Sequence, residues 1–353
     1  MDREPFVGRQ EELGKLRNAI ARAADGVGSI VLVEGPQGTG KSKMLAELER
    51  VAAEDGSLDD PIFATGECFA ELQQGAYLPF ATLLGQIKHS DGSGRRRLLG
   101  IGKIITDTAP GWMSLLPGAG PLVGMGVKTV ASAGLALWGS GGSETLDQQF
   151  VATIQRLVQG KHPLVLRIEN VQWIDRASTG LLLRLAQLTE TRGVVIVLTC
   201  RPGDTNRDGA LGRIRSELAS NDRFQVVALG DLGQSDVATY LVRRFGTKFG
   251  DDFPAWLVHL CHGNPLFLSQ YLSLLTERDV IRRTDDRYTL DGSASFVDGR
   301  WRVTGRLDEI PVPKEISDLL LLRIQNLDRD EERMLGIGSV QGLSFDSLVL
   351  AKV

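Results

Sequence analysis

Through the first two thirds of the chain, short apolar runs alternate with segments whose apolar residues recur at helical spacing. Apolar residues recur every three or four positions in segments such as 9–24 and 181–188, which predicts amphipathic helices. Between the helices, five runs rich in β-branched and apolar residues predict buried strands, at 29–33, 62–65, 164–168, 194–199 and 224–229. This alternation predicts an α/β fold with a five-stranded parallel sheet flanked by helices.

A long insert, residues 68–144, separates the second predicted strand from the third. Gly/Ser-rich punctuation at 90–94 and 139–143 suggests a helical but irregular segment. Its stretch 120–138 approaches the length of a membrane span, but small residues dominate it, so we expect a packed helix and no membrane contact. The basic run at 95–97 could touch phosphate, although a solvated helix end is the favoured interpretation.

From residue 231 onward the strand pattern gives way to helices. Helical periodicity in 231–282 predicts a small helical domain, and 283–310 predicts a β-hairpin or extended linker. Pro311 and Pro313 then mark a boundary before a further helical segment. The residues after Pro313 are few for an independent core, so we expect the chain to stop inside a domain.

Composition narrows the class of protein. The 353 residues are 42% apolar, enough for two or three globular domains. The formal charge of −4 gives no overall positive field, so nucleic acid is not an expected partner of this segment. Cys68, Cys200 and Cys261 lack the spacing of a zinc site or disulfide framework and are expected to be buried thiols. The charged N-terminus is no secretory signal, and we expect a cytoplasmic protein.

The most specific motif follows the first predicted strand and precedes a helix. It is a P-loop made of Gly35, Pro36, Gln37, Gly38, Thr39, Gly40, Lys41 and Ser42, with Lys43 next in the helix. Its glycines let backbone N–H groups form an anion-binding nest, to which the helix adds its positive end. Lys41 is expected to reach the β- and γ-phosphates and Ser42 to bind Mg²⁺, so the predicted ligands are ATP (or ADP) and Mg²⁺.

The third predicted strand ends in Glu169 and Asn170. Glu169 is expected to act with Ser42 in holding Mg²⁺. Asn170 cannot accept a proton, so general-base assistance of roughly 10²- to 10⁴-fold would be missing at this position. Asp175 could substitute only if the loop folds back. The sequence therefore predicts ATP binding with slow or impaired hydrolysis and leaves enzymatic turnover open.

The fourth predicted strand ends in Thr199 and Arg201, where a polar side chain and a cation would face the γ-phosphate. Arg201 is a candidate catalytic sensor of that phosphate. The alternative, a loop arginine placed before Pro202, remains open.

Five motifs occur in an order that resembles STAND-type AAA+ ATPases, the large bacterial signal-transduction regulators. They are the segment 6–9, the P-loop, the segment 169–175, the segment 199–202 and the segment 263–267. The resemblance implies that Val7, Gly8, Arg9 and Pro265 border the adenine. The family commonly has two acids where this chain has Glu169 and Asn170.

The resemblance also implies a domain order. It places a P-loop AAA+ domain at 1–230, a helical lid at 231–282, a hairpin or linker at 283–310 and a partial winged-helix domain at 311–353, with Arg323 in its first helix. The leading hypothesis is a nucleotide-dependent conformational switch that acts through a protein partner or self-association. The alternatives are a replication-initiator-like AAA+ DNA-binding protein and a pseudo-ATPase scaffold that holds nucleotide permanently.

Overall fold

The structure is a computed structural model, and it describes most of the chain. The described residues are 4–70, 76–89, 107–108, 112, 143–159, 162–189, 193–202, 209–284, 287–297, 300–325 and 329–341. The basic run 95–97 and the apolar stretch 120–138 lie outside them. The chain divides into a core unit, Phe6–Gly230, and a C-terminal unit, Asp231–Val353 with Met1–Pro5.

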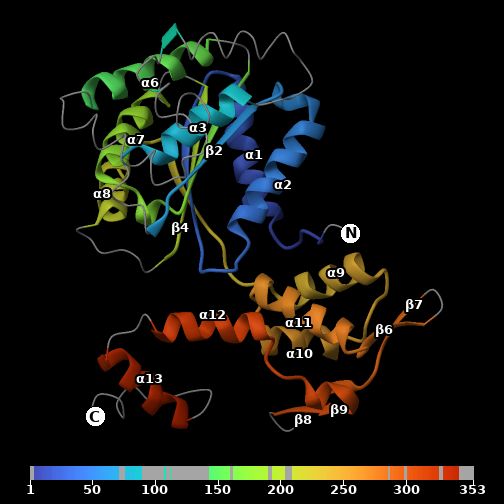
Figure 1. Cartoon of the computed structure of the whole chain (residues 1–353). Coiled ribbons are helices and arrows are strands. Elements are labelled where there is room, and N and C mark those ends of the chain that lie inside the picture. The colour runs from blue at the N-terminus through green and yellow to red at the C-terminus, as the bar shows by residue number, and fades with distance from the viewer. Residues whose placement is uncertain are drawn as a thin grey trace. The chain divides into compact units, whose positions relative to one another are not determined.

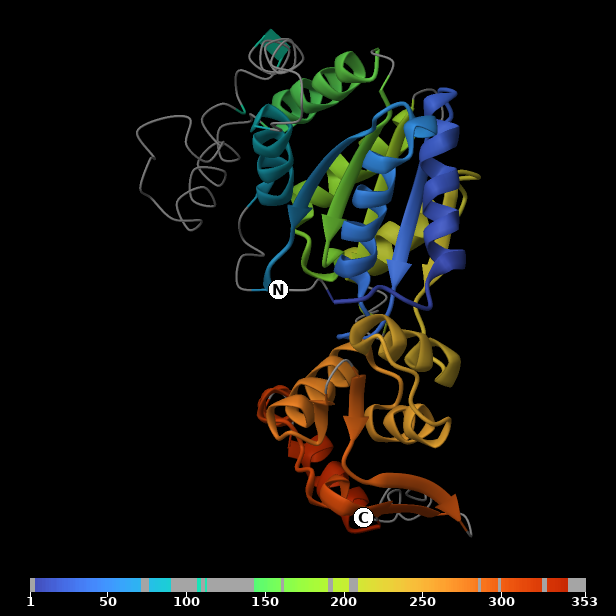
Figure 2. The same ribbon diagram turned by 90° about the vertical axis from the view of Figure 1, so that its right-hand side faces the viewer.

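The core unit contains the five-stranded parallel sheet that the sequence predicts, in the order β2-β3-β4-β1-β5. The strands are β1 (Ser29–Glu34), β2 (Ile62–Glu67), β3 (Leu164–Glu169), β4 (Val194–Cys200) and β5 (Phe224–Ala228). The helices are α1 (Gln10–Ala24), α2 (Lys41–Glu54), α3 (Leu78–His89), α6 (Ser143–Leu157), α7 (Arg176–Leu188) and α8 (Ala210–Leu218), with short 3₁₀ turns η1 (Gly56–Leu58) and η4 (Val171–Trp173). Figures 1 and 2 show helices on both faces of this sheet.

Strand alternation explains the two layers. Side chains of successive strand residues point to opposite faces, so Val31 and Val33 of β1 pack with α1 and α2, whereas Ile30 and Leu32 join the cluster formed with α3, α6, α7 and α8. All four are fully buried. Because both faces of the sheet are covered at its centre, β1 and β4 are apolar along most of their length, and polar side chains gather where the strands end.

Strand β2 runs close to the beginning of α3. A Cβ atom added at Gly66 would lie 2.2 Å from the carbonyl oxygen of Pro79. The α3 layer then contributes Phe80, which packs edge-on against Phe150 of α6 with ring centroids 5.1 Å apart. Glycine at position 66 thus lets the start of α3 lie directly against the end of β2.

The C-terminal unit combines helices with two β-hairpins. Its helices are α9 (Gln234–Phe245), α10 (Asp252–Cys261), α11 (Pro265–Glu277), α12 (Lys314–Gln325) and α13 (Arg329–Gln341). The antiparallel pairs are β6 (Ile281–Thr284) with β7 (Arg287–Leu290), and β8 (Ser293–Val297) with β9 (Arg300–Thr304), followed by the 3₁₀ turn η5 (Gly305–Glu309). The assignment of these elements to a lid and a winged helix stays a prediction.

The Gly-Asn-Pro sequence forms the junction between α10 and α11. Gly263 has φ +71°, and a Cβ atom there would lie 2.4 Å from the carbonyl oxygen of Leu232. Asn264 caps α11, because its side-chain oxygen accepts hydrogen bonds from the backbone N–H groups of Leu266 and Phe267. Pro265 occupies the first turn, where its missing N–H costs nothing.

Two further expectations concern thiols and membranes. Cys68, Cys200 and Cys261 are buried and free, as expected from their spacing. Within the described ranges, no helix has both the length and the apolar character needed to span a membrane.

Candidate functional site

The P-loop joins β1 to α2 at the edge of the sheet where the parallel strands end. Gly38 and Gly40 have φ +86° and +89°, in the left-handed region that favours glycine. A Cβ atom on Gly35 would lie 2.6 Å from the hydroxyl oxygen of Thr39. That hydroxyl donates to the carbonyl oxygen of Pro36 at 2.9 Å, which tightens the turn. Gly40 is the N-terminal cap of α2, so the positive end of the helix lies at this loop.

Lys41 lies folded against the loop. Its Nζ atom donates to the carbonyl oxygen of Gly35 at 2.5 Å and to that of Pro36 at 3.0 Å. Burial lowers the pKa of Lys41, and the nearby positive charge of Arg201 lowers it further. Two cations therefore lie close together at a turn rich in backbone donors, which is an arrangement that favours a multiply charged anion.

Ser42 and Glu169 meet beside the loop. The Ser42 hydroxyl donates to Oε2 of Glu169 at 2.5 Å. Oε1 of Glu169 accepts a hydrogen bond from Arg167 at 3.1 Å, and Arg167 also donates to Glu49 of α2 at 3.1 Å. A hydroxyl and a carboxylate are hard oxygen ligands of the kind that Mg²⁺ takes together with substrate phosphates, so this donor set fits the metal.

The described residues offer no larger cluster of metal-binding side chains than the pair Ser42 and Glu169. Among the residues that the structure describes, no group of three or more histidine, cysteine, aspartate or glutamate side chains could hold a metal ion. A metal site at Ser42 and Glu169 would thus need ligands from outside the protein, as phosphates and water provide.

Asn170 directly follows β3, and its backbone leaves the extended conformation of the strand. Its φ is +58°, and its backbone N–H donates to the hydroxyl of Thr199 at 3.0 Å. Its side-chain amide donates to Oε1 of Glu67, the last residue of β2, at 3.2 Å. Burial raises the pKa of Glu67, and the negative charge of Glu169 raises it further. A second carboxylate therefore stands at the strand ends, beside the position where the sequence offers only an amide.

Sequence reasoning missed Glu67. The second strand was predicted to end at residue 65, and Glu67 is separated from Glu169 by the whole insert. The available signal was its position at the end of a strand, because the ends of parallel strands meet at one edge of a sheet.

Two predicted neighbours of the phosphate have other partners. Asp175 accepts a hydrogen bond from the backbone N–H of Ser178 at 2.9 Å and caps α7. The conditional suggestion that Asp175 replaces Asn170 is thus wrong, because its carboxylate is committed to the helix start. The hydroxyl of Thr199 is buried and accepts from Asn170, so Thr199 fixes the end of β3 to β4.

Arg201 lies over the ring of Trp173 in η4, with its guanidinium carbon 4.9 Å from the ring centroid. The contact is a cation–π interaction and limits the positions that the guanidinium adopts. Because Arg201 also lowers the pKa of Lys41, its charge acts on the P-loop. Its role as a γ-phosphate sensor stays a prediction.

The segment before α1 is fastened to the P-loop. Val7 is buried, Gly8 has φ +68° and Arg9 is 6% exposed. The guanidinium of Arg9 donates to the carbonyl oxygen of Thr39 at 3.5 Å and to that of Gly230 at 2.5 Å. The arginine therefore binds backbone on two sides. Contact of this segment with adenine stays a prediction, as does the role of Pro265, which lies in the C-terminal unit.

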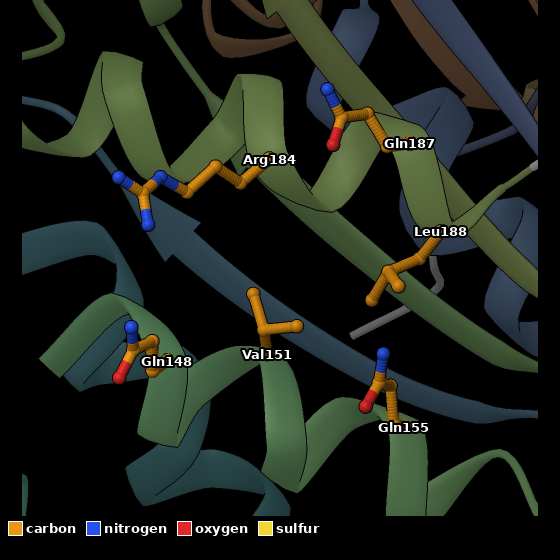
Figure 3. A pocket seen from close by; sticks show the side chains of 6 residues that line it. All are labelled: Gln148, Val151, Gln155, Arg184, Gln187 and Leu188. Atoms are coloured by element: carbon orange, nitrogen blue, oxygen red, sulfur yellow. The ribbon is translucent and has the colours of Figure 1, made fainter. Parts of the chain in front are cut away.

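A cleft of about 510 Å³ lies elsewhere in the core unit, between α6 and α7. Figure 3 shows the side chains that face it, which are Gln148, Val151, Gln155, Arg184, Gln187 and Leu188. Arg184 is engaged with Asp147, whose Oδ2 lies 3.4 Å from its Nε. Because α7 leads back toward the beginning of β4, its last residues lie near the amino ends of the strands, away from the phosphate loop.

Comparison with known proteins gives one sequence match and several structural likenesses. A family model described as an AAA ATPase domain matches residues 5–197. No curated protein sequence matches the chain significantly.

Three solved structures illustrate the structural likenesses. The ORC1 protein of Aeropyrum pernix, solved in complex with DNA, has 16% identity and a TM-score of 0.48, over 99% of this chain and 82% of that one. Cdc6p of Pyrobaculum aerophilum has 13% identity and a TM-score of 0.46, over 79% and 64%. Drosophila ORC bound to DNA has 12% identity and a TM-score of 0.45, over 100% and 80%. Likenesses at these TM-scores carry no conclusion about function.

Proposed function

Because the chain belongs to the family of AAA ATPase domains, we propose that it binds ATP with Mg²⁺ at the P-loop and acts as a nucleotide-dependent switch. The observation that carries the proposal is the position of Lys41 against a glycine turn, next to the Ser42–Glu169 pair, with Arg201 near enough for its charge to lower the pKa of Lys41. Lys41 would exchange its two carbonyl contacts for the β- and γ-phosphates. Ser42 and Glu169 would hold Mg²⁺, which neutralises phosphate charge when bound.

Arg9 supplies a physical route from the phosphate loop to the end of the core unit. Its guanidinium joins the carbonyl of Thr39, within the P-loop, to that of Gly230, the last residue of the unit. A change in the conformation of the P-loop on nucleotide binding would therefore alter the position of Gly230, where the chain passes to the C-terminal unit. This route supports the switch that the resemblance to STAND-type regulators implies, and it requires no particular arrangement of the two units.

Hydrogen exchange tests the switch. We expect backbone amides at 231–240 to exchange at different rates in the presence of a non-hydrolysable ATP analogue and of ADP, both with Mg²⁺. Arg9→Gln should reduce that difference at least threefold while fluorescent ATP still binds, because the shorter glutamine side chain cannot reach both carbonyl oxygens. Equal exchange with both nucleotides in the wild type would contradict the switch. Nucleotide that survives extensive dialysis would favour the permanent scaffold instead.

One observation favours DNA binding as a second candidate function. The hairpins of the C-terminal unit and the turn η5 that follows them expose Arg283, Arg302 and Arg306, and Phe296 is 58% exposed beside them in sequence. Exposed cations in this stretch, with an accessible aromatic side chain near two of them in sequence, suit a polyanion such as DNA. DNA binding would have to depend on these few cations, because the formal charge of the whole chain is −4.

The DNA candidate predicts binding to a labelled duplex that weakens steeply between 50 and 200 mM salt, tested with ATP present. The double variant Arg302→Ala with Arg306→Ala should reduce the salt dependence, whereas Arg17→Ala on α1 should not. Absence of any binding at 50 mM salt would remove this candidate.

A further inference from the structure

The end of β2 carries a carboxylate that none of the roles above uses. Glu67 is the last residue of β2 and the register partner of Glu169, the last residue of β3. One residue further on, the backbone N–H of Cys68 donates to the carbonyl oxygen of Glu169 at 3.0 Å, so the two backbone segments stay paired just beyond the end of β2. Glu67 thus lies at the same edge of the sheet as the carboxylate that contacts Ser42.

Asn170 fixes the position of this carboxylate. Its Nδ2 atom donates to Oε1 of Glu67 at 3.2 Å. The backbone of Asn170 is held in its left-handed conformation by the hydrogen bond to Thr199. The amide is therefore aimed across the strand ends at Glu67, and Asn170 acts as a positioning residue.

The neighbouring acids are committed elsewhere. Glu169 accepts from Ser42 and Arg167, Asp175 caps α7, and Glu34 at the end of β1 is paired with Arg215 of α8. Glu67, by contrast, forms no salt bridge with any residue in the described part of the chain. Its side chain is exposed, so water reaches it. A solvent-exposed carboxylate held in place by a neighbouring amide can act as a general base toward a bound water.

We propose that Glu67, held by Asn170, is the catalytic carboxylate that orients the attacking water during ATP hydrolysis and accepts its proton. The water oxygen forms the new bond to the γ-phosphorus, the bond from that phosphorus to the β,γ-bridging oxygen breaks, and ADP leaves with the electron pair. The proton taken by Glu67 passes to solvent. The proposal rests on the proposed function that ATP binds at the P-loop. In it, Glu67 of β2 takes the general-base role that Asn170, after β3, cannot fill.

Single-turnover hydrolysis of γ-³²P-labelled ATP with Mg²⁺ tests the proposal, alongside the Kd for a fluorescent ATP analogue. Glu67→Gln should slow hydrolysis by roughly 10²- to 10⁴-fold, the usual contribution of a general base, and change the Kd by less than about threefold. Glu67→Gln combined with Asn170→Glu returns a carboxylate to the strand ends and should recover at least tenfold in rate. Glu217→Gln, an exposed acid on α8, is the matched control and should change neither quantity.

Each contrary outcome points to a specific error. Hydrolysis by Glu67→Gln within threefold of wild type would overturn the proposal while leaving ATP binding intact. The proposal is also overturned if wild-type hydrolysis is no faster than that of Lys41→Ala, or if Glu67→Gln loses binding in proportion to rate. Failure of the wild type to bind ATP would instead overturn the proposed function.

Discussion

Replacing Lys41 with alanine should weaken ATP binding roughly 30- to 150-fold, because a charged hydrogen bond to phosphate contributes about 2 to 3 kcal/mol. In the structure the Lys41 amine is held by two carbonyl oxygens of the loop itself, at 2.5 and 3.0 Å. Its charge is also disfavoured by burial and by Arg201, which lower its pKa. The negative charge of a triphosphate would offset both effects, so the Lys41 charge is expected to favour binding.

Equilibrium titration with a fluorescent ATP analogue measures the loss. The matched control is Lys15→Ala, which removes the same charge from the exposed face of α1, where Lys15 pairs with Glu11 at 2.7 Å. Its Kd should equal that of the wild type. Thermal unfolding of both variants separates lost binding from lost folding. If Lys41→Ala binds ATP within threefold of the wild type, the P-loop is not the nucleotide site.

Glu169→Gln should raise the Mg²⁺ concentration needed for half-maximal tightening of ATP binding by roughly 10- to 100-fold. The amide oxygen still accepts from Ser42 and Arg167, but the negative charge that a divalent cation requires is lost. The expected size follows from a charged interaction of about 1.5 to 3 kcal/mol. A Mg²⁺ titration at fixed fluorescent ATP, with EDTA as the baseline, gives the measurement.

Glu49→Gln provides a close comparison for this prediction. Glu49 also accepts from Arg167 at 3.1 Å, yet its side chain is 53% exposed, and the Ser42 hydroxyl donates to Glu169 instead. The Mg²⁺ dependence of Glu49→Gln should stay near that of the wild type. Equal shifts in the two variants would mean that the charge on Arg167, and not a metal ligand, was being measured.

Much of the core unit could be predicted along the chain. The five strands follow from short runs rich in apolar residues, and the P-loop follows from spacing alone, because its glycines, lysine and serine act within eight consecutive residues. In the C-terminal unit, the cap that Asn264 forms on α11 likewise involves residues only two and three positions away. Such features are visible in sequence because the interacting groups are neighbours.

The base position could not be predicted in this way. Asn170 was interpreted as a missing acid because only its sequence neighbours, Glu169 and Asp175, could be compared with it. Asp175 is nearby in sequence, but its carboxylate caps a helix. Glu67 is remote in sequence, yet parallel pairing places it beside Glu169.

Periodicity and contiguous motifs encode local conformation, so the strands of the sheet, the phosphate loop and the amide at a position where the resemblance implies an acid could all be identified along the chain. The carboxylate that faces this amide, the ring on which Arg201 lies and the carbonyl oxygens that Arg9 binds became known only from the folded chain. Those contacts join segments that are not neighbours in the sequence. Their geometry depends on strand order and register, which no stretch of neighbouring residues specifies.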